Sequence, residues 1–137
     1  MSSAPPKTFA FRLDLHSGVP VFRQIIDQVQ AGIASGTLQY GDQLPTVRQV
    51  AVDLTINPNT VLRAYREMEI RGIVDTQQGT GTFIASRKIE QSKAERERVL
   101  AQLVGELVSR AGAGGFTVQE LMDALREVQS EAGRKRR

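Results

Sequence analysis

The chain has 137 residues and 40% hydrophobic content, which suits one small domain, or one domain with an appendage. It has no cysteine, which excludes disulfides, thiolate metal sites and cysteine nucleophiles; it also has neither a signal-peptide pattern nor an apolar run of the roughly 20 residues that span a bilayer. The net charge is +3, but residues 1–86 contain seven basic and seven acidic side chains, so bulk charge does not by itself predict a nucleic-acid binder. We expect a soluble cytoplasmic protein.

Residues 1–8 are expected to form a disordered lead, and the first predicted element follows it. Residues 9–15 (FAFRLDL) alternate apolar side chains with polar or small ones, which predicts a half-buried strand. Pro20 suits the first turn of a helix, and apolar residues at helical spacing continue from there. A helix is therefore predicted to end near Ser35, with Gly36 as its C-terminal stop.

Two short amphipathic helices are predicted next. Thr46 opens a capping box at the first helix, which runs to about Leu54. Asn57 as N-cap and Pro58 at the first helical position begin the second helix, which ends at Gly72. Two short helices joined by three or four residues have helix-turn-helix geometry.

Residues 73–85 place β-branched side chains on both sides of a glycine-rich turn at 77–81, which predicts a hairpin. The glycines could also be interpreted as a phosphate-binding loop, but such a loop is followed by a helix, whereas a strand-like TFIA follows here. A helix-turn-helix followed by a hairpin is a winged helix. Residues 9–86 are therefore predicted to form a winged helix-turn-helix domain in an α+β protein.

Residues 87–137 predict an all-α tail. Two apolar stripes of helical spacing are separated by the glycine-rich break at 111–115, and Thr117 with Glu120 forms a capping box at the second stripe. A helical hairpin this small buries too little surface to fold well alone, so we expect its stripes to contact a second subunit. The predicted dimer contacts are Val99, Leu100, Leu103, Val104, Leu107, Val108, Leu121, Met122 and Leu125.

A polar stripe on the second helix of the pair carries the main functional hypothesis. Asn59, Arg63 and Arg66 recur at helical spacing, separate from the apolar face formed by Val61 and Tyr65. Such a stripe is most often a solvated surface. The neighbouring helix and hairpin instead favour a recognition helix, because Asn and Arg side chains match base edges in a major groove.

Other polar residues have two interpretations each. Arg48 is either a surface charge near Asp53 or Glu69, or a DNA contact beside the recognition helix. Thr46 and Thr60 are helix caps, phosphate donors or both. The basic residues 134–137 are interpreted as a frayed end, with a non-specific DNA contact as the alternative.

No catalytic pattern is visible. The single histidine, His16, is interpreted as a turn residue, and no cluster has the spacing of metal ligands. No triad or paired carboxylates stand out, so we expect no enzyme activity, metal or cofactor.

At this point residues 20–85 resemble the GntR family of bacterial regulators, and the NPNTVLRAY string with the short tail resembles its YtrA-like subfamily. The motifs that carry the resemblance are PVFRQI (20–25), SGTLQYGDQLPTVRQVA (35–51), INPNTVLRAYREMEIRGIV (56–74) and QQGTGTFI (77–84). Together they cover about half of the chain.

The resemblance implies a homodimer on a pseudo-palindromic operator, usually acting as a repressor. Matching positions imply DNA contacts by Arg48, Asn57, Asn59, Thr60 and the wing residue Gly79, whereas Leu62 departs from the arginine of other subfamilies. The full predicted DNA-binding set is Thr46, Arg48, Asn57, Asn59, Thr60, Arg63, Arg66, Gln78, Gly79 and Thr80.

Larger relatives carry effector-sensing or aminotransferase-like domains. The 51 residues after Ser86 are too few for either, so no large effector pocket is expected, and any small-molecule effector is unknown. The alternative function is that of a winged-helix module that docks onto another protein.

Overall fold

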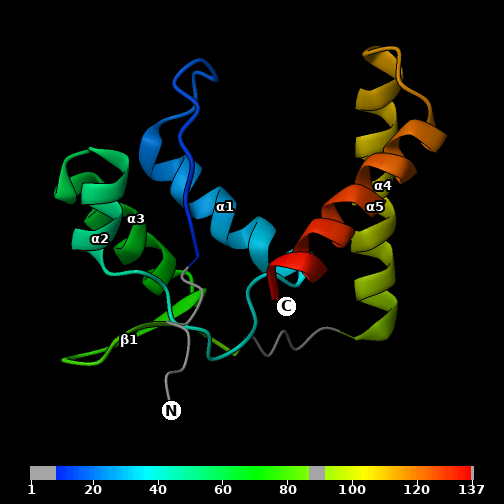
Figure 1. The fold of residues 1–137 in the computed structure, drawn as a ribbon. Coiled ribbons are helices and arrows are strands. Elements are labelled where there is room, and N and C mark those ends of the chain that lie inside the picture. The colour runs from blue at the N-terminus through cyan, green and yellow to red at the C-terminus, as the bar shows by residue number, and fades with distance from the viewer. Residues whose placement is uncertain (1–8, 87–91, 137) are drawn as a thin grey trace. The chain divides into compact units, whose positions relative to one another are not determined.

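The computed structural model describes residues 9–86 and 92–136, with the chain divided into two compact units, residues 1–87 and 88–137 (Figure 1). The described residues form five helices and one two-stranded sheet. The predicted fold class, a winged helix-turn-helix followed by a helical region, is confirmed. The predicted disordered lead, residues 1–8, lies outside the described residues.

The strand predicted over residues 9–15 is wrong, and its predicted burial pattern holds only in part, because Leu15 is 79% exposed. Phe11 is buried and Phe9 packs against the core, yet this segment has no regular secondary structure. Its backbone is paired with two side-chain amides in place of a neighbouring strand. Gln28 accepts from the Arg12 N–H at 2.9 Å and donates to the Arg12 carbonyl at 2.6 Å, and Gln24 makes the equivalent pair with Asp14 at 2.9 Å each.

The first helix, α1 (Val21–Ser35), forms where it was predicted. Pro20 is its N-cap and so stands one position before the predicted first turn. Gly36 ends the helix in a left-handed conformation with φ of 87°, which glycine adopts without the usual steric cost. The buried face of α1 consists of Ile25, Ile26, Val29 and Gly32.

The helix-turn-helix consists of α2 (Val47–Leu54) and α3 (Pro58–Ile70). The predicted capping box is present, since the Thr46 hydroxyl accepts from the Gln49 N–H and the Gln49 side chain accepts from the Thr46 N–H. Asn57 caps α3, with its side chain accepting from the Asn59 N–H at 2.8 Å. The helix ends at Ile70, two residues before the predicted Gly72.

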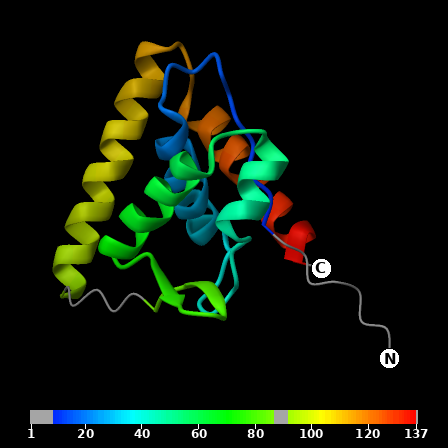
Figure 2. The same ribbon diagram turned by 90° about the vertical axis from the view of Figure 1, so that its left-hand side faces the viewer.

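The predicted wing is a hairpin of β1 (Val74–Gln77) and β2 (Gly81–Ile84), paired antiparallel with Val74 opposite Ile84. Figures 1 and 2 both show it at one end of the group formed by α1, α2 and α3. Residues 41–44 follow the other edge of β2: the Leu44 N–H donates to the Thr82 carbonyl at 2.9 Å and the Ile84 N–H to the Asp42 carbonyl at 2.9 Å.

One hydrophobic core joins these elements. α3 packs against both α1 and α2, and β1 packs against α3. The largest fully buried side chains come from the three helices and β1: Ile25, Ile26, Val29, Val50, Val61, Met68 and Val74. The recognition-helix candidate is therefore the element on which the other helices of this unit pack.

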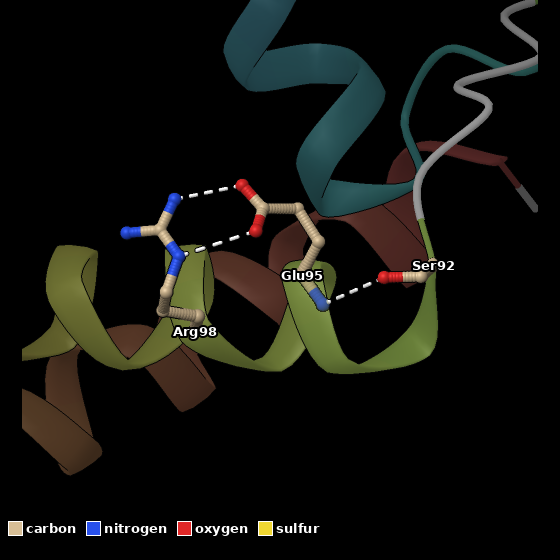
Figure 3. Close-up of polar contacts among 3 residues, drawn as sticks. All are labelled: Ser92, Glu95 and Arg98. Atoms are coloured by element: carbon tan, nitrogen blue, oxygen red, sulfur yellow. Dashed lines mark hydrogen bonds and ion pairs between the residues drawn. The ribbon is translucent and has the colours of Figure 1, made fainter.

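The second unit contains α4 (Lys93–Ala113) and α5 (Val118–Arg136). Figure 3 shows the start of α4, where Ser92 accepts from the Glu95 N–H at 3.1 Å and Arg98 forms a fork with Glu95 at 2.7 and 3.2 Å. The Arg98 hydrogen bond lowers the pKa of the Glu95 carboxyl.

The predicted box at the start of α5 is also present, with Glu120 accepting from the Thr117 N–H at 2.8 Å. This helix includes Arg134 to Arg136, which were expected to be frayed. Among the described residues, no helix combines the length and apolarity needed to cross a membrane.

Candidate nucleic-acid interface

A buried side-chain hydrogen bond connects α3 to a residue just before the start of α2 and so stabilises the arrangement of these two helices. The Tyr65 hydroxyl, on α3, donates a hydrogen bond to the carbonyl of Pro45, which lies just before α2. Burial raises the pKa of Tyr65 above its usual value, so the hydroxyl keeps its proton and remains a donor. The sequence predicted Tyr65 only as an apolar core residue, and its hydroxyl partner was not foreseen.

The predicted polar stripe forms the exposed face of α3. Asn59, Arg63 and Arg66 are exposed, whereas Val61 and Tyr65 on the other side are buried. The exposed face lines a shallow hollow of about 310 Å³, together with Leu62, Glu67 and Ile70. The structure therefore brings the three predicted groove residues together on one surface.

Arg63 has a partner that sequence reasoning missed. Its guanidinium carbon lies 3.9 Å from the centre of the Phe22 ring, which comes from the first turn of α1. This distance is well within the range of a cation–π interaction. No local signal predicts it, because the two residues belong to different helices that meet only in the folded domain.

The predicted DNA-binding residues near the helix starts differ in exposure. Arg48 is exposed on the first turn of α2, and within the described residues it forms no ion pair with Asp53 or Glu69. Glu69 instead accepts a hydrogen bond from Thr76 at 3.3 Å. Thr60 is half-buried, and its N–H donates to the Asn57 carbonyl at 3.0 Å.

The wing tip presents Gln78, Gly79 and Thr80, all of them exposed. The turn is closed by the Thr80 N–H, which donates to the Gln77 carbonyl at 3.0 Å, and Gly79 has φ of 80°. Gln43, from the segment before α2, donates its side-chain amide to the Thr80 carbonyl at 3.2 Å. The sequence did not predict this support for the tip.

The positive charge of the candidate interface comes from arginines without acidic partners in the described structure, and not from an excess of basic over acidic residues. Among residues 9–86, the one ion pair joins Arg71 to Glu67 at 3.0 Å. The guanidinium groups of Arg48, Arg63 and Arg66 therefore keep their N–H donors free of acidic partners in the described structure. Within the described residues there is also no group of side chains with the composition of a metal site.

The predicted dimer residues lie on the two helices of the second unit. Seven of them are exposed, and Val99 and Leu121 are half-buried. Among the large apolar residues of α4, Leu100 and Leu103 are the most exposed, at 61% and 58%. Exposed apolar residues on α5 that were not in the predicted set are Val118 and Val128.

Known proteins resemble this chain over most of its length. The family described as bacterial regulatory proteins, gntR family, matches residues 22–84. The repressor YtrA of Bacillus subtilis (strain 168) is 30% identical over 120 residues, covering 88% of this chain and 92% of that protein. The regulator Rv1152 of Mycobacterium tuberculosis is 38% identical over 120 residues, covering 88% and 94%.

Solved structures give the same result. A transcriptional antiterminator from Listeria monocytogenes EGD-e is 25% identical with a TM-score of 0.65, covering 92% of this chain and 94% of that one. YtrA from Sulfolobus acidocaldarius, a GntR-family transcription factor, is 28% identical with a TM-score of 0.52, covering 88% and 97%. The chain belongs to the GntR family of bacterial regulatory proteins and, within it, to the short regulators similar to YtrA.

Proposed function

We propose that this DNA-binding transcription regulator acts as a repressor, and that it binds a pseudo-palindromic operator as a homodimer through α3 and the wing. The observation that carries the proposal is the exposed face of α3, where Asn59, Arg63 and Arg66 lie together at the surface of a helix-turn-helix.

The start of α3 is suited to a major groove. A groove of B-DNA admits one helix, and side chains of the first turns reach the base edges. Asn59 offers the paired donor and acceptor that match adenine, and Arg63 offers the paired donors that match guanine. The first N–H groups of a helix also attract phosphate, because they lack partners within the helix.

Flanking groups are proposed to bind the DNA backbone. Thr46 and Arg48 at the start of α2 and Arg66 on α3 are positioned on exposed surface and carry donors suited to phosphate. At the wing tip, Gln78 and Thr80 add polar donors, and Gly79 leaves room for close approach of a backbone. These contacts set orientation, and α3 sets sequence preference.

Dimerisation is proposed to occur through the apolar faces of α4 and α5. A winged domain with no net positive charge gains little from bulk electrostatics, so two copies on two half-sites supply the additional binding energy. The exposed apolar side chains of α4 would be covered by the same face of the second copy, as a two-fold interface requires. Repression is supported by the YtrA relative of Bacillus subtilis, which is named a repressor.

The experiment begins with DNA selected by the wild-type protein from a random duplex pool. Fluorescence anisotropy then gives Kd for the selected duplex and for a scrambled one. Asn59→Ala and Arg66→Ala are compared with Arg12→Ala, which removes a charge from an exposed residue outside the interface. Asn59→Ala should weaken binding to the selected duplex by about 5- to 100-fold and leave the scrambled duplex nearly unchanged. Wild-type affinity in both interface variants would refute the assignment of α3.

A second function is supported by the charge balance of residues 1–86, which is neutral. Winged helices with such a surface can also dock onto proteins. The two functions differ in their salt dependence, because a protein that neutralises phosphates loses affinity steeply as salt rises. The docking module would show no duplex binding even at low salt.

A further inference from the structure

The stack between α1 and α3 carries an inference that rests on the proposed function and deepens it. We propose that Phe22 is a positioning residue for Arg63. Its ring keeps the guanidinium in one orientation and presents the N–H donors to a pair of DNA acceptors. That pair is either the O6 and N7 of a guanine or two oxygens of one phosphate, which share the same planar, bidentate geometry.

Phe22 can support a side chain because it is itself constrained. It lies on the first turn of α1, is half-buried, and packs against the hydrophobic core of the winged unit. Its ring therefore does not move independently of the domain. Arg63 comes from α3, which packs on α1, and its guanidinium carbon lies 3.9 Å from the ring centre.

Stacking leaves the donors of Arg63 available. With the guanidinium carbon 3.9 Å over the ring centre, a parallel stack would place the ring on the flat face of the guanidinium and leave its five N–H donors pointing outward in the plane. Among the described residues, the Arg63 side chain forms no hydrogen bond and no ion pair. The acid one turn further along α3, Glu67, is paired with Arg71 at 3.0 Å and so does not compete for Arg63.

Orientation has value because an arginine side chain is long and mobile. Rotamer entropy is lost when such a side chain is immobilised, and a stack that restricts it before binding reduces this loss. Arg66 lies on the same exposed face without a ring partner among the described residues. The structure thus distinguishes an arginine placed over a ring from one without such a partner in the described residues, and the proposal gives α1 a part in recognition without contact to DNA.

The test is a double-mutant cycle on the selected duplex. Phe22→Leu keeps an apolar side chain but removes the ring, and Phe22→Tyr keeps the ring. Phe22→Leu should raise Kd by about 3- to 10-fold, and Phe22→Tyr should stay within about 2-fold of wild type. In the Arg63→Ala background, Phe22→Leu should cause no further loss, because its effect acts through Arg63.

Controls separate positioning from folding. Phe9→Leu alters another half-buried phenylalanine of the same core, over whose ring no cation lies in the described part of the chain, and should leave Kd unchanged. Thermal melting of every variant identifies losses that come from unfolding. An equal loss for Phe22→Leu in the wild-type and Arg63→Ala backgrounds would overturn the inference and leave Phe22 a packing residue.

Two outcomes distinguish this inference from the proposed function. If Asn59→Ala weakens specific binding but the cycle shows no coupling, the inference fails and the proposed function stands. If neither Asn59→Ala nor Arg63→Ala affects binding, the proposed function fails as well.

Duplexes with single 7-deazaguanine or methylphosphonate substitutions identify the DNA acceptor of Arg63. If the 7-deazaguanine substitution abolishes the difference in Kd between wild type and Arg63→Ala, the acceptor is the guanine base. If the methylphosphonate substitution abolishes it, the acceptor is the phosphate.

Discussion

The hydroxyl of Tyr65 on α3 donates a hydrogen bond to the carbonyl of Pro45, which lies 20 residues earlier and just before α2. This contact joins the two helices of the helix-turn-helix by a directional bond in addition to apolar packing. The orientation of the proposed recognition helix therefore depends in part on one side-chain donor.

Tyr65→Phe removes that donor and keeps the ring. We expect the free energy of unfolding to fall by about 1–2 kcal/mol, because a buried acceptor loses its partner. Urea denaturation followed by circular dichroism measures this free energy of unfolding. Tyr40→Phe is the matched control, since Tyr40 is 73% exposed, and it should change stability by less than about 0.5 kcal/mol. Equal stability of Tyr65→Phe and wild type would show that the hydroxyl contributes nothing net.

The buried hydroxyl of Tyr65 should also make the stability of the fold depend on pH in the alkaline range. Burial raises the pKa of Tyr65 in the folded state, so the unfolded chain ionises first, at the ordinary tyrosine pKa of about 10. The stabilisation from the neutral hydroxyl is complete below about pH 10 and is lost as pH rises toward the folded pKa. The stability difference between wild type and Tyr65→Phe should therefore shrink above pH 10. Urea titrations at pH 8, 9.5 and 11 test this, and a constant difference would contradict it.

Thr55, in the turn between α2 and α3, has φ of 55° and ψ of 51°, and it is the one described residue other than glycine with a positive φ. A β-branched side chain is strained there, whereas asparagine tolerates this conformation. Thr55→Asn should raise the free energy of unfolding by about 0.5–1 kcal/mol. Thr55→Val keeps the branch at Cβ and should give no gain in the same denaturation experiment. Loss of stability in Thr55→Asn would show that the threonine side chain makes a needed contact.

Gly81 at the start of β2 has φ of 143°, and a Cβ there would lie 2.5 Å from the side-chain nitrogen of Gln43. Gly81→Ala must displace that amide from its bond with the Thr80 carbonyl and strain the backbone as well. We expect a loss of about 2–3 kcal/mol, against about 1 kcal/mol for Gln43→Ala, which removes only the hydrogen bond. Thermal melting compares the two. If Gly81→Ala costs no more than Gln43→Ala, backbone conformation at Gly81 is unimportant.

The proposed dimer contact predicts a change in mass. Leu103→Glu places a charge in the exposed apolar face of α4 and should shift the protein to a monomer in light scattering, because an unpaired charge is costly to bury. Gln102→Glu, at the neighbouring exposed position on the same helix, should leave the assembly state unchanged. A dimeric Leu103→Glu protein at micromolar concentration would place the contact elsewhere.

Local signals determined most of the regular elements of this protein. The capping residues Thr46 and Asn57 and the helical spacing of the apolar residues are effects of neighbours within one turn, so α1, α2 and α3 follow from the sequence alone. The β-branched residues on either side of the glycine turn determined the hairpin in the same way.

Tertiary structure decided what depends on partners far apart in the chain. Alternation in residues 9–15 predicted that Phe9 and Phe11 face the core, but the backbone of this segment pairs with the amides of Gln24 and Gln28 and forms no strand. Only the folded domain brings Phe22 to Arg63, because two helices must pack before a ring and a cation from each can meet. The spacing of apolar residues predicts which side chains are buried, because burial depends on each residue's own polarity. A directional polar contact depends on two residues, and its geometry is set only when the folded chain positions both.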